Sequence, residues 1–182
     1  MTEERNVVVF IAMSLDGYIA KSDGDISFLS AVEKDGEDYG YSEFIKSVDT
    51  VIMGRKTFDH VFEMGFDNPH PDKEVYILSR SEQYDNGLTK YFKGSLQGLV
   101  ADLKGSPGKN IYCDGGAEVI NALLSENLID ELIISIIPVM LGDGISLFKS
   151  GRPDNEMELI NTRHYDKGLV QLHYKRILSN QL

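Results

Sequence analysis

Apolar, β-branched runs alternate with amphipathic segments along most of this chain, and the segments meet at turns rich in glycine. Residues 7–13 are apolar throughout, which is expected of a strand that is covered on both faces. Residues 41–48 instead place apolar side chains at positions 41, 44, 45 and 48, which is the spacing of one face of a helix. The same patterns predict further strands at 50–53, 74–78, 88–92, 110–113, 132–139, 158–165 and 169–177, and further helices at 57–62, 96–104 and 117–126.

The order of these elements predicts the architecture. Strands and helices alternate as far as residue 126, and three strands follow one another from residue 132 onward. Alternating units form parallel sheets, whereas consecutive strands pair antiparallel. We therefore expect an α/β fold in which helices flank a mostly parallel sheet of about eight strands with an antiparallel C-terminal edge. Because its 182 residues contain no repeat or linker, the chain is expected to be one domain, 1–182, with a core at about 6–177.

The composition excludes several classes of partner. The chain has 18 basic and 29 acidic residues, a formal net charge of −11, whereas nucleic acids and anionic membranes require a basic face. One cysteine excludes an intramolecular disulfide and is consistent with a reducing cytosol. The N-terminus lacks the basic region of a signal peptide, and the apolar run at 7–13 is far too short to span a bilayer. We expect a soluble, cytoplasmic protein with no nucleic-acid or membrane partner.

Two strand-to-helix turns carry the residues of an anion-binding site. Gly54-Arg55-Lys56-Thr57 follows one expected strand, and Gly115-Gly116-Ala117-Glu118 follows another. Glycine lets the backbone approach a ligand closely, and the first N–H groups of a helix and its dipole favour negative charge. Neither turn matches the standard dinucleotide or P-loop pattern. Two such turns suggest a ligand with more than one phosphate, and Arg80, just past a third strand, offers a charged fork for a phosphate monoester.

The sequence predicts no metal site. The four histidines and the single cysteine show no ligand spacing. Asp23-Gly24-Asp25 does not fit a calcium loop because Phe28 occupies the place of the required glycine.

An ordered set of short motifs connects the chain to a known family. The motifs are Ala12-Met13-Ser14-Leu15-Asp16-Gly17-Tyr18-Ile19-Ala20, Val51-Ile52-Met53-Gly54-Arg55-Lys56-Thr57-Phe58, Tyr76-Ile77-Leu78-Ser79-Arg80, Cys113-Asp114-Gly115-Gly116-Ala117, Asp130-Glu131-Leu132, Pro138, Leu141-Gly142-Asp143-Gly144 and Leu147-Phe148. In this order, from about residue 6 to residue 176, they resemble the dihydrofolate-reductase-like fold. Within it, the chain is similar to the reductase domain of the bifunctional riboflavin-biosynthesis deaminase-reductase. The sequence contains neither the His-x-Glu nor the Pro-Cys-x-x-Cys motif of the deaminase half.

The resemblance implies that NADPH is the cofactor. Ala12 and Ile19 correspond to positions that line the nicotinamide, and Ser79 and Arg80 face the adenosine 2′-phosphate, which NADH lacks. The resemblance also implies that Leu78 contacts the cofactor. It places Gly54, Arg55, Lys56 and Thr57 at the phosphates, and Gly115, Gly116, Ala117 and Glu118 on the pyrophosphate side.

Three side chains are candidates for the chemistry: Ser14, Asp16 and Asp38. Dihydrofolate reductases carry a buried helical carboxylate upstream of the glycine that corresponds to Gly54, and counting back reaches Asp38. A partly apolar cleft would raise the pKa of this carboxyl group and let it protonate a nitrogen heterocycle. The alternative is that residues 33–38 form a solvated acidic loop. Ser14 and Asp16 belong to a Ser-Leu-Asp-Gly turn typical of the riboflavin branch, for which simple turn chemistry is the alternative.

The leading hypothesis is an NADPH-dependent reductase of a small heterocycle. The resemblance suggests that the substrate is 5-amino-6-(5-phosphoribosylamino)uracil and that the hydride is transferred to the ribosyl C1. Dihydrofolate is the second candidate substrate. Relatives hold its glutamate tail with an arginine, whereas this chain has Asp72-Lys73-Glu74 at that place. A nucleotide-binding module without turnover is the alternative from a different class. The apolar strand at 133–137 could support a homodimer as easily as a core.

Overall fold

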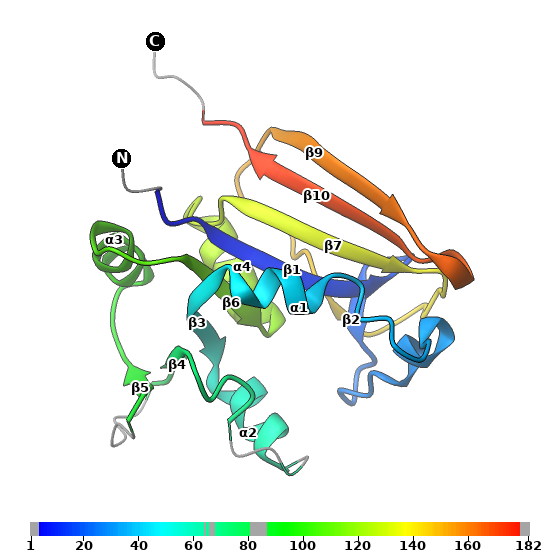
Figure 1. Ribbon diagram of the computed structural model, residues 1–182, viewed down its shortest axis with the longest axis horizontal. Coiled ribbons are helices and arrows are strands. Elements are labelled where there is room, and N and C mark those ends of the chain that lie inside the picture. Colours follow the sequence, from blue (N-terminus) through cyan, green and yellow to red (C-terminus); the bar gives the residue numbers. More distant parts are fainter. Residues whose placement is uncertain (1–3, 64, 66–67, 81–86, 179–182) are drawn as a thin grey trace.

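The computed structural model describes residues 4–63, 65, 68–80 and 87–178, and its centre is a sheet of eight strands (Figure 1). Six strands are parallel, and the last two pair antiparallel at one edge. This arrangement confirms the predicted fold class. Across the sheet the strands are β5 (Thr89–Phe92), β4 (Glu74–Leu78), β3 (Val48–Gly54), β6 (Asn110–Gly115), β1 (Val7–Ser14), β7 (Glu131–Ile137), β10 (Val170–Arg176) and β9 (Met157–His164).

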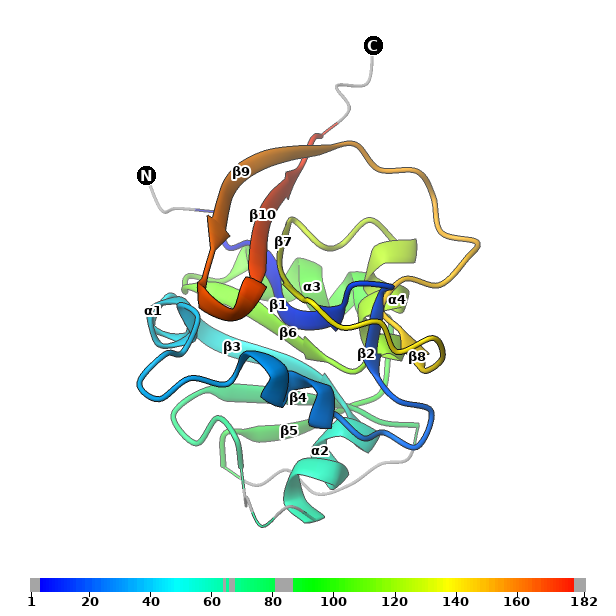
Figure 2. The ribbon, with the colours of Figure 1, turned by 90° about the vertical axis from the view of Figure 1, so that its right-hand side faces the viewer.

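Helices cover both faces of the sheet. Figure 2 shows α1 (Tyr41–Lys46) and α4 (Ala117–Ser125) on opposite sides. Successive side chains of a strand point to opposite faces, so Val7 and Val9 pack with α3 (Leu96–Gly105) and α4, whereas Val8 packs with the α1 side. Helix α2 (Arg55–Glu63) follows β3 directly. Burial of both faces explains why the parallel strands are continuous apolar runs in the sequence.

Several short elements were not predicted. Residues 15–27, where the sequence patterns predict neither a strand nor a helix, contain the strand β2 (Tyr18–Ala20), which pairs with β8 (Ile145–Ser146) more than a hundred residues away. Two 3₁₀ helices, η1 (Ser27–Val32) and η2 (Asp166–Gly168), complete the fold. Strands of two or three residues carry too few side chains to give a periodic signal, so only the tertiary structure defines them.

The strand β7 lies inside the sheet, between β1 and β10. Its residues Leu132, Ile134 and Ile137 are buried within the protein. The apolar character of this strand is therefore explained by the core. The homodimer stays a prediction, and it would have to form through other surfaces.

Candidate cofactor and substrate site

The two glycine turns lie against each other at the carboxyl ends of β3 and β6, which are neighbours in the sheet. A methyl group at Gly54 would lie 3.6 Å from the carbonyl oxygen of Gly115 and 3.7 Å from the nitrogen of Gly116. A methyl group at Gly116 would lie 3.0 Å from Oγ1 of Thr57. The Gly115–Gly116 peptide bond is cis. Because these positions lack side chains, the two turns pack closely into one continuous cradle, in which Gly54 and Gly116 are half-buried and Gly115 is buried.

Each of the two glycine turns is followed directly by a helix. Helix α2 begins at Arg55, two residues before the predicted start, because the chain turns directly from Gly54 into the helix. Helix α4 begins at Ala117, and no side chain caps its N-terminus. The first-turn N–H groups of a helix have no partner within the helix, and the helix dipole adds positive charge there. The cradle therefore combines backbone without side chains with two helix N-termini.

Three cations surround Glu118, the exposed acidic residue of α4. A hydrogen bond from Lys149 is the main cause of the lowered pKa of the Glu118 carboxyl group, and Lys56 and Arg80 add smaller electrostatic contributions. Lys56 and Arg80 are exposed, and neither forms an ion pair with another residue in the described part of the chain. Lys149 was not predicted for this site, because it reaches Glu118 from a segment 31 positions further along the chain.

Arg55, unlike Lys56 in the same turn, forms an ion pair. Its Nε donates to Oδ1 of Asp59 at 2.6 Å, one helical turn away, and its guanidinium lies 5.6 Å from the ring centre of Tyr91. These contacts direct the Arg55 side chain along its own helix.

The remaining residues expected at the cofactor lie around the same edge. Ala12 lines a cleft on the α1 face of the sheet, and Ile19 and Leu78 are half-buried against the main core. Ser79 follows β4, and its backbone N–H donates to the carbonyl of Phe92 at 3.0 Å. Ala117 is buried.

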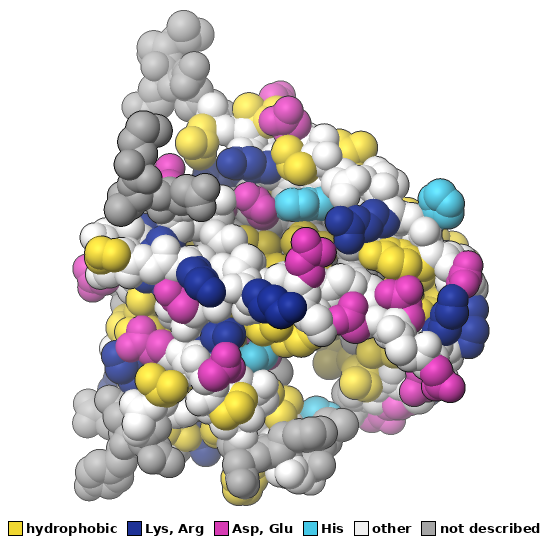
Figure 3. Space-filling model, viewed as in Figure 1, with side chains coloured by type: hydrophobic (Ala, Val, Ile, Leu, Met, Phe, Trp, Pro, Cys, Tyr) yellow, Lys and Arg dark blue, Asp and Glu magenta, His cyan; other side chains and the backbone are white. Residues whose placement is uncertain are grey.

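An apolar cleft of about 790 Å³ lies over β1, the strand next to β6, on the α1 face of the sheet. Its walls include Phe10 and Ala12 of β1, Tyr41 of α1, Ile137 of β7 and Leu169. The volume falls in the range of small-molecule sites. The space-filling view shows a hollow between the part of the molecule that carries α2 and the part that carries η1, bordered by hydrophobic side chains (Figure 3).

Asp38 stands on the rim of this cleft rather than on a helix. It is exposed, and its carboxylate accepts hydrogen bonds from the N–H groups of Gly40 and Ser42, both at 2.9 Å. Hydrogen bonds from the side chain and backbone of Ser42 lower the pKa of the Asp38 carboxyl group, the opposite of the direction expected for a buried acid. In this position Asp38 ties the loop to the first turn of α1.

Ser14 and Asp16 connect the end of β1 to a distant loop. The hydroxyl of buried Ser14 donates to Oδ1 of Asp16 at 2.6 Å and accepts from the N–H of Tyr18 at 2.9 Å. Asp16 also accepts from the N–H groups of Leu141 at 3.1 Å and Gly142 at 2.7 Å. The hydrogen bond from Ser14 is the main reason that the pKa of Asp16 is lowered to about 2. The pair thus holds the turn that follows Ala12 and Met13 in place.

The lowered pKa of Asp16 predicts an effect on stability. Since its folded-state pKa lies below the ordinary value of 3.8, the carboxylate stabilises the fold above that value and loses this contribution as the pH falls towards 2. Asp16→Asn should therefore lower the urea midpoint at about pH 7, and the difference from the unmodified protein should shrink towards about pH 2. Asp154→Asn, in an exposed segment, is the control. A midpoint difference that stays constant with pH would contradict this role.

A polar cluster that the sequence patterns did not predict lies at the end of β6. Asp114 immediately precedes Gly115, and its carboxylate contacts both the imidazole of His70 and the hydroxyl of Tyr112. His70 is buried, and it lies 44 positions from Asp114 in the sequence. The sequence does show an acidic residue between a buried strand and a Gly-Gly turn. No local pattern, however, indicates that His70 is its partner.

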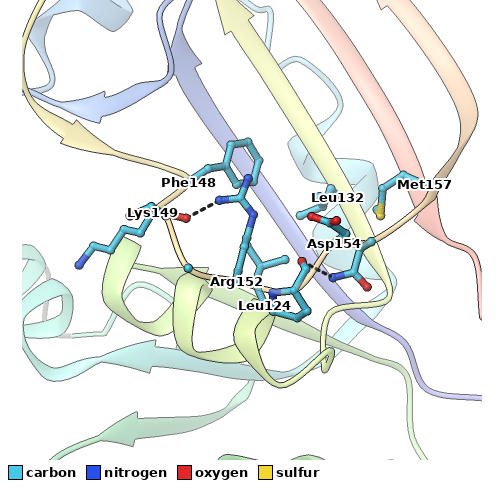
Figure 4. A pocket seen from close by; sticks show the side chains of 11 residues that line it. Leu124, Leu132, Phe148, Lys149, Arg152, Asp154 and Met157 are labelled. Atoms are coloured by element: carbon cyan, nitrogen blue, oxygen red, sulfur yellow. Dashed lines mark hydrogen bonds between the residues drawn. The ribbon is translucent and has the colours of Figure 1, made fainter.

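A second pocket lies between α4 and the segment that precedes β9 (Figure 4). Two of its polar side chains have partners: Arg152 donates to the carbonyl of Lys149, and Asn155 donates to Asn127 at 2.9 Å. Arg152 also lies over the ring of Phe148. Lys149, which pairs with Glu118, also lines this pocket, so the pocket reaches the cations beside the cradle.

Across the described residues, no three or more His, Cys, Asp or Glu side chains are placed to hold a metal ion. In the same part of the chain, every helix is too short or too polar to cross a bilayer.

The fold is that of the dihydrofolate-reductase-like class. Dihydrofolate reductase from Enterococcus faecalis, solved as a complex with NADP(H) and the compound RAB-propyl, superposes with a TM-score of 0.62 at 17% identity, covering 94% of this chain and 96% of that one. The chain belongs to the RibD C-terminal domain family, whose model matches residues 5–171. This family and fold place the protein among the reductases of that superfamily.

Closer relatives cover nearly the whole chain. The uncharacterized protein YwjB of Bacillus subtilis (strain 168) is 42% identical, over 95% of this chain and 99% of its own length. A Shewanella sp. PV-4 protein provisionally assigned to riboflavin biosynthesis has a TM-score of 0.86 at 33% identity, covering 95% of this chain and 99% of that one.

Proposed function

We propose that this protein is an NADPH-dependent reductase of a small nitrogen heterocycle, of the type that reduces 5-amino-6-(5-phosphoribosylamino)uracil. The observation that carries the proposal is the single cradle formed by Gly54 and Gly115–Gly116, with Lys56 and Arg80 beside it. A polyphosphate ligand needs such a local positive site in a chain of net charge −11. The Enterococcus faecalis enzyme of the same fold was solved with NADP(H).

Each part of the site has a role in this proposal. The cradle and the two helix N-termini hold the pyrophosphate, and Arg80 with Ser79 meets the 2′-phosphate. Bound NADPH supplies the hydride, and the protein supplies orientation and a cleft that excludes water. The apolar walls that include Ala12 and Tyr41 bring the heterocycle beside the nicotinamide end of the cradle. We also propose that the chain acts as a single cytoplasmic reductase domain.

Dihydrofolate is the second candidate substrate. A Candida albicans dihydrofolate reductase is 34% identical to this chain, but over only 47% of this chain and 43% of its own length. Lys73, at the position where relatives hold the folate tail, pairs with Asp72 at 2.5 Å and lacks the bidentate fork of arginine. We expect weak or no dihydrofolate turnover.

NADPH oxidation by the purified protein tests these alternatives. The phosphoribosylaminouracil and dihydrofolate are each added with NADPH, and NADPH binding is titrated in parallel. Oxidation with the uracil compound supports the proposal. Efficient dihydrofolate turnover, with kcat/KM of about 10⁴–10⁸ M⁻¹s⁻¹, would reverse the ranking of substrates. Binding of NADPH without oxidation in either mixture would favour a nucleotide-binding module.

The charge of the cleft rim predicts which part of the substrate is recognised. The rim carries Glu33, Asp35, Glu37 and Asp38, and its lysine, Lys34, is paired with Asp166. A phosphate at this rim meets repulsion, which salt screens. The dephosphorylated ribosylaminouracil should therefore have a KM no higher than that of the phosphorylated compound, and any advantage should shrink as salt is added. A KM about tenfold higher without the phosphate would mean that a cation holds it.

A further inference from the structure

The pocket between α4 and the segment that precedes β9 has a volume of about 600 Å³, which falls in the range of small-molecule sites. Its apolar lining consists of Leu124 of α4, Leu132 of β7, Phe148, and Met157 of β9. All four belong to the main hydrophobic core or pack against it, but Leu124, Phe148 and Met157 are only half-buried. The pocket is therefore an edge of the core that remains open to a ligand.

Residues 149–155 form the polar wall of this pocket, and hydrogen bonds hold the wall near both of its ends. The backbone N–H of Lys149 donates to Oδ1 of the buried Asn121 of α4 at 2.8 Å. Near the other end, the side chain of Asn155 donates to Oδ1 of Asn127 at 2.9 Å. A wall that is already ordered loses less conformational freedom when a ligand binds, so the pocket is prepared for an occupant.

Arg152 is the cation that faces this pocket, and two contacts hold its guanidinium. It donates to the carbonyl oxygen of Lys149, and its central carbon lies 5.0 Å from the ring centre of Phe148. Figure 4 shows the Arg152 side chain reaching from the polar wall to that ring. A guanidinium carries more N–H donors than this single bond uses, so donors remain for a ligand. Among the residues that the structure describes, Arg152 forms no ion pair.

The other charged side chains at the pocket narrow the class of ligand. Lys149 pairs with Glu118, and Figure 4 shows its side chain extending away from Arg152. Asp154 also lines the pocket, and its negative charge repels any ligand that carries a second negative charge. A single carboxylate matches the planar guanidinium, which can bind it through two parallel hydrogen bonds. The pocket therefore suits an apolar group that carries one carboxylate.

We propose that this pocket binds a small apolar monocarboxylate, with its apolar group against Leu124, Leu132 and Met157 and its carboxylate on Arg152. The pocket lies on the α4 side of the sheet, whereas the cleft proposed for the heterocycle lies on the α1 side (Figure 2). The inference thus goes beyond the proposed reductase function and does not depend on it, because binding here requires no cofactor.

Calorimetric titration of the unmodified protein with 4-phenylbutyrate, in the absence of NADPH, tests the proposal. The compound carries a phenyl group, a short alkyl chain and a carboxylate, and it should bind saturably with a Kd of about 1 mM or tighter. Its amide, 4-phenylbutyramide, lacks the charge and should bind about tenfold more weakly or worse. The dianion phenylsuccinate should also bind more weakly than 4-phenylbutyrate.

Three results of these titrations would overturn the proposal. The first is the absence of saturable 4-phenylbutyrate binding up to about 10 mM. The second is equal affinity for the acid and the amide, which would mean that no cation meets the carboxylate. The third is equal or tighter binding of phenylsuccinate, which would contradict the assignment to a monoanion.

Substitution of Arg152 tests the carboxylate contact directly. Arg152→Met keeps an apolar stem at an exposed position, so the variant should fold, and it should bind 4-phenylbutyrate as weakly as the unmodified protein binds the amide. Arg152→Lys keeps the charge without the planar fork and should bind with intermediate affinity. Arg163→Met, at an exposed arginine of β9 outside the pocket, is the matched control and should bind normally. Unchanged binding by Arg152→Met would refute the proposed contact.

NMR of the methionine methyl groups shows where 4-phenylbutyrate binds. Met157 lines the pocket, whereas Met53 of β3 is fully buried in the core cluster on the other face of the sheet. The phenyl ring should move the methyl signal of Met157 with the Kd found by calorimetry and leave that of Met53 unmoved. Saturable binding that leaves the Met157 signal unmoved would place the compound elsewhere, such as the cleft on the α1 face, and would overturn the proposal.

Discussion

Replacement of Arg80 by alanine is expected to weaken NADPH binding by about 10–100-fold and to leave NADH binding nearly unchanged. Arg80 directly follows Ser79 at the end of β4, and it lies close enough to Glu118 of α4 to influence the pKa of that carboxyl group. A guanidinium at this place can form a charged fork with the 2′-phosphate monoester that distinguishes the two cofactors. The lost hydrogen bonds correspond to about 1.5–3 kcal/mol.

Calorimetric titration of each cofactor into the variant measures this effect. Arg163→Ala, an exposed arginine on β9 at the far edge of the sheet, is the matched control and should bind both cofactors normally. Equal losses of NADPH and NADH affinity in Arg80→Ala would mean that Arg80 meets the pyrophosphate or only shapes the local fold. Unchanged NADPH affinity would remove Arg80 from the site.

Arg5→Met should lower the free energy of unfolding by about 3–5 kcal/mol, the largest effect on stability that we expect. The Arg5 side chain is 6% exposed, and its guanidinium makes four hydrogen bonds at the amino ends of β1 and β3. It donates to the carbonyls of Lys109 at 2.7 Å and Leu103 at 2.9 Å, to Asp49 at 2.6 Å and to Thr50 at 2.7 Å. Methionine fills much of the space but leaves these acceptors without their donor.

Urea denaturation followed by circular dichroism measures the loss, and an unchanged m-value would show that it reflects native-state stability. Arg152→Met is the control, since this exposed arginine donates to a single carbonyl, and its loss should cost less than about 0.5 kcal/mol. A loss below about 1 kcal/mol for Arg5→Met would mean that water replaces the four hydrogen bonds readily.

The sheet was predictable from sequence because its parallel strands are buried on both faces and therefore read as apolar runs, as Val7–Ser14 does. The glycine turns were predictable for a related reason. Gly115, with φ near +100°, adopts a backbone conformation that other residues rarely accept, and a glycine pair between strand and helix is visible in one sequence. That the two turns form one cradle follows from the adjacency of β3 and β6, which the sequence does not specify.

Interactions between distant positions were not predictable. Asp16 binds the N–H groups of Leu141 and Gly142, and Asp114 binds His70, so both carboxylates take partners that no local pattern connects to them. The raised pKa expected for Asp38 was wrong for a local reason, because its carboxylate accepts hydrogen bonds at the start of α1 instead of facing an apolar wall. Burial and partners, which decide such roles, are tertiary properties.

The most direct test of the account is an equilibrium titration of the unmodified protein with NADPH and with NADH. If Gly54, Gly115 and Gly116 form a pyrophosphate cradle with Arg80 at the 2′-phosphate, NADPH should bind saturably to one site per chain, about tenfold or more tighter than NADH. The difference should narrow as salt screens the cations. Equal affinities would contradict the role of Arg80, and the absence of saturable binding of either cofactor would contradict the central claim.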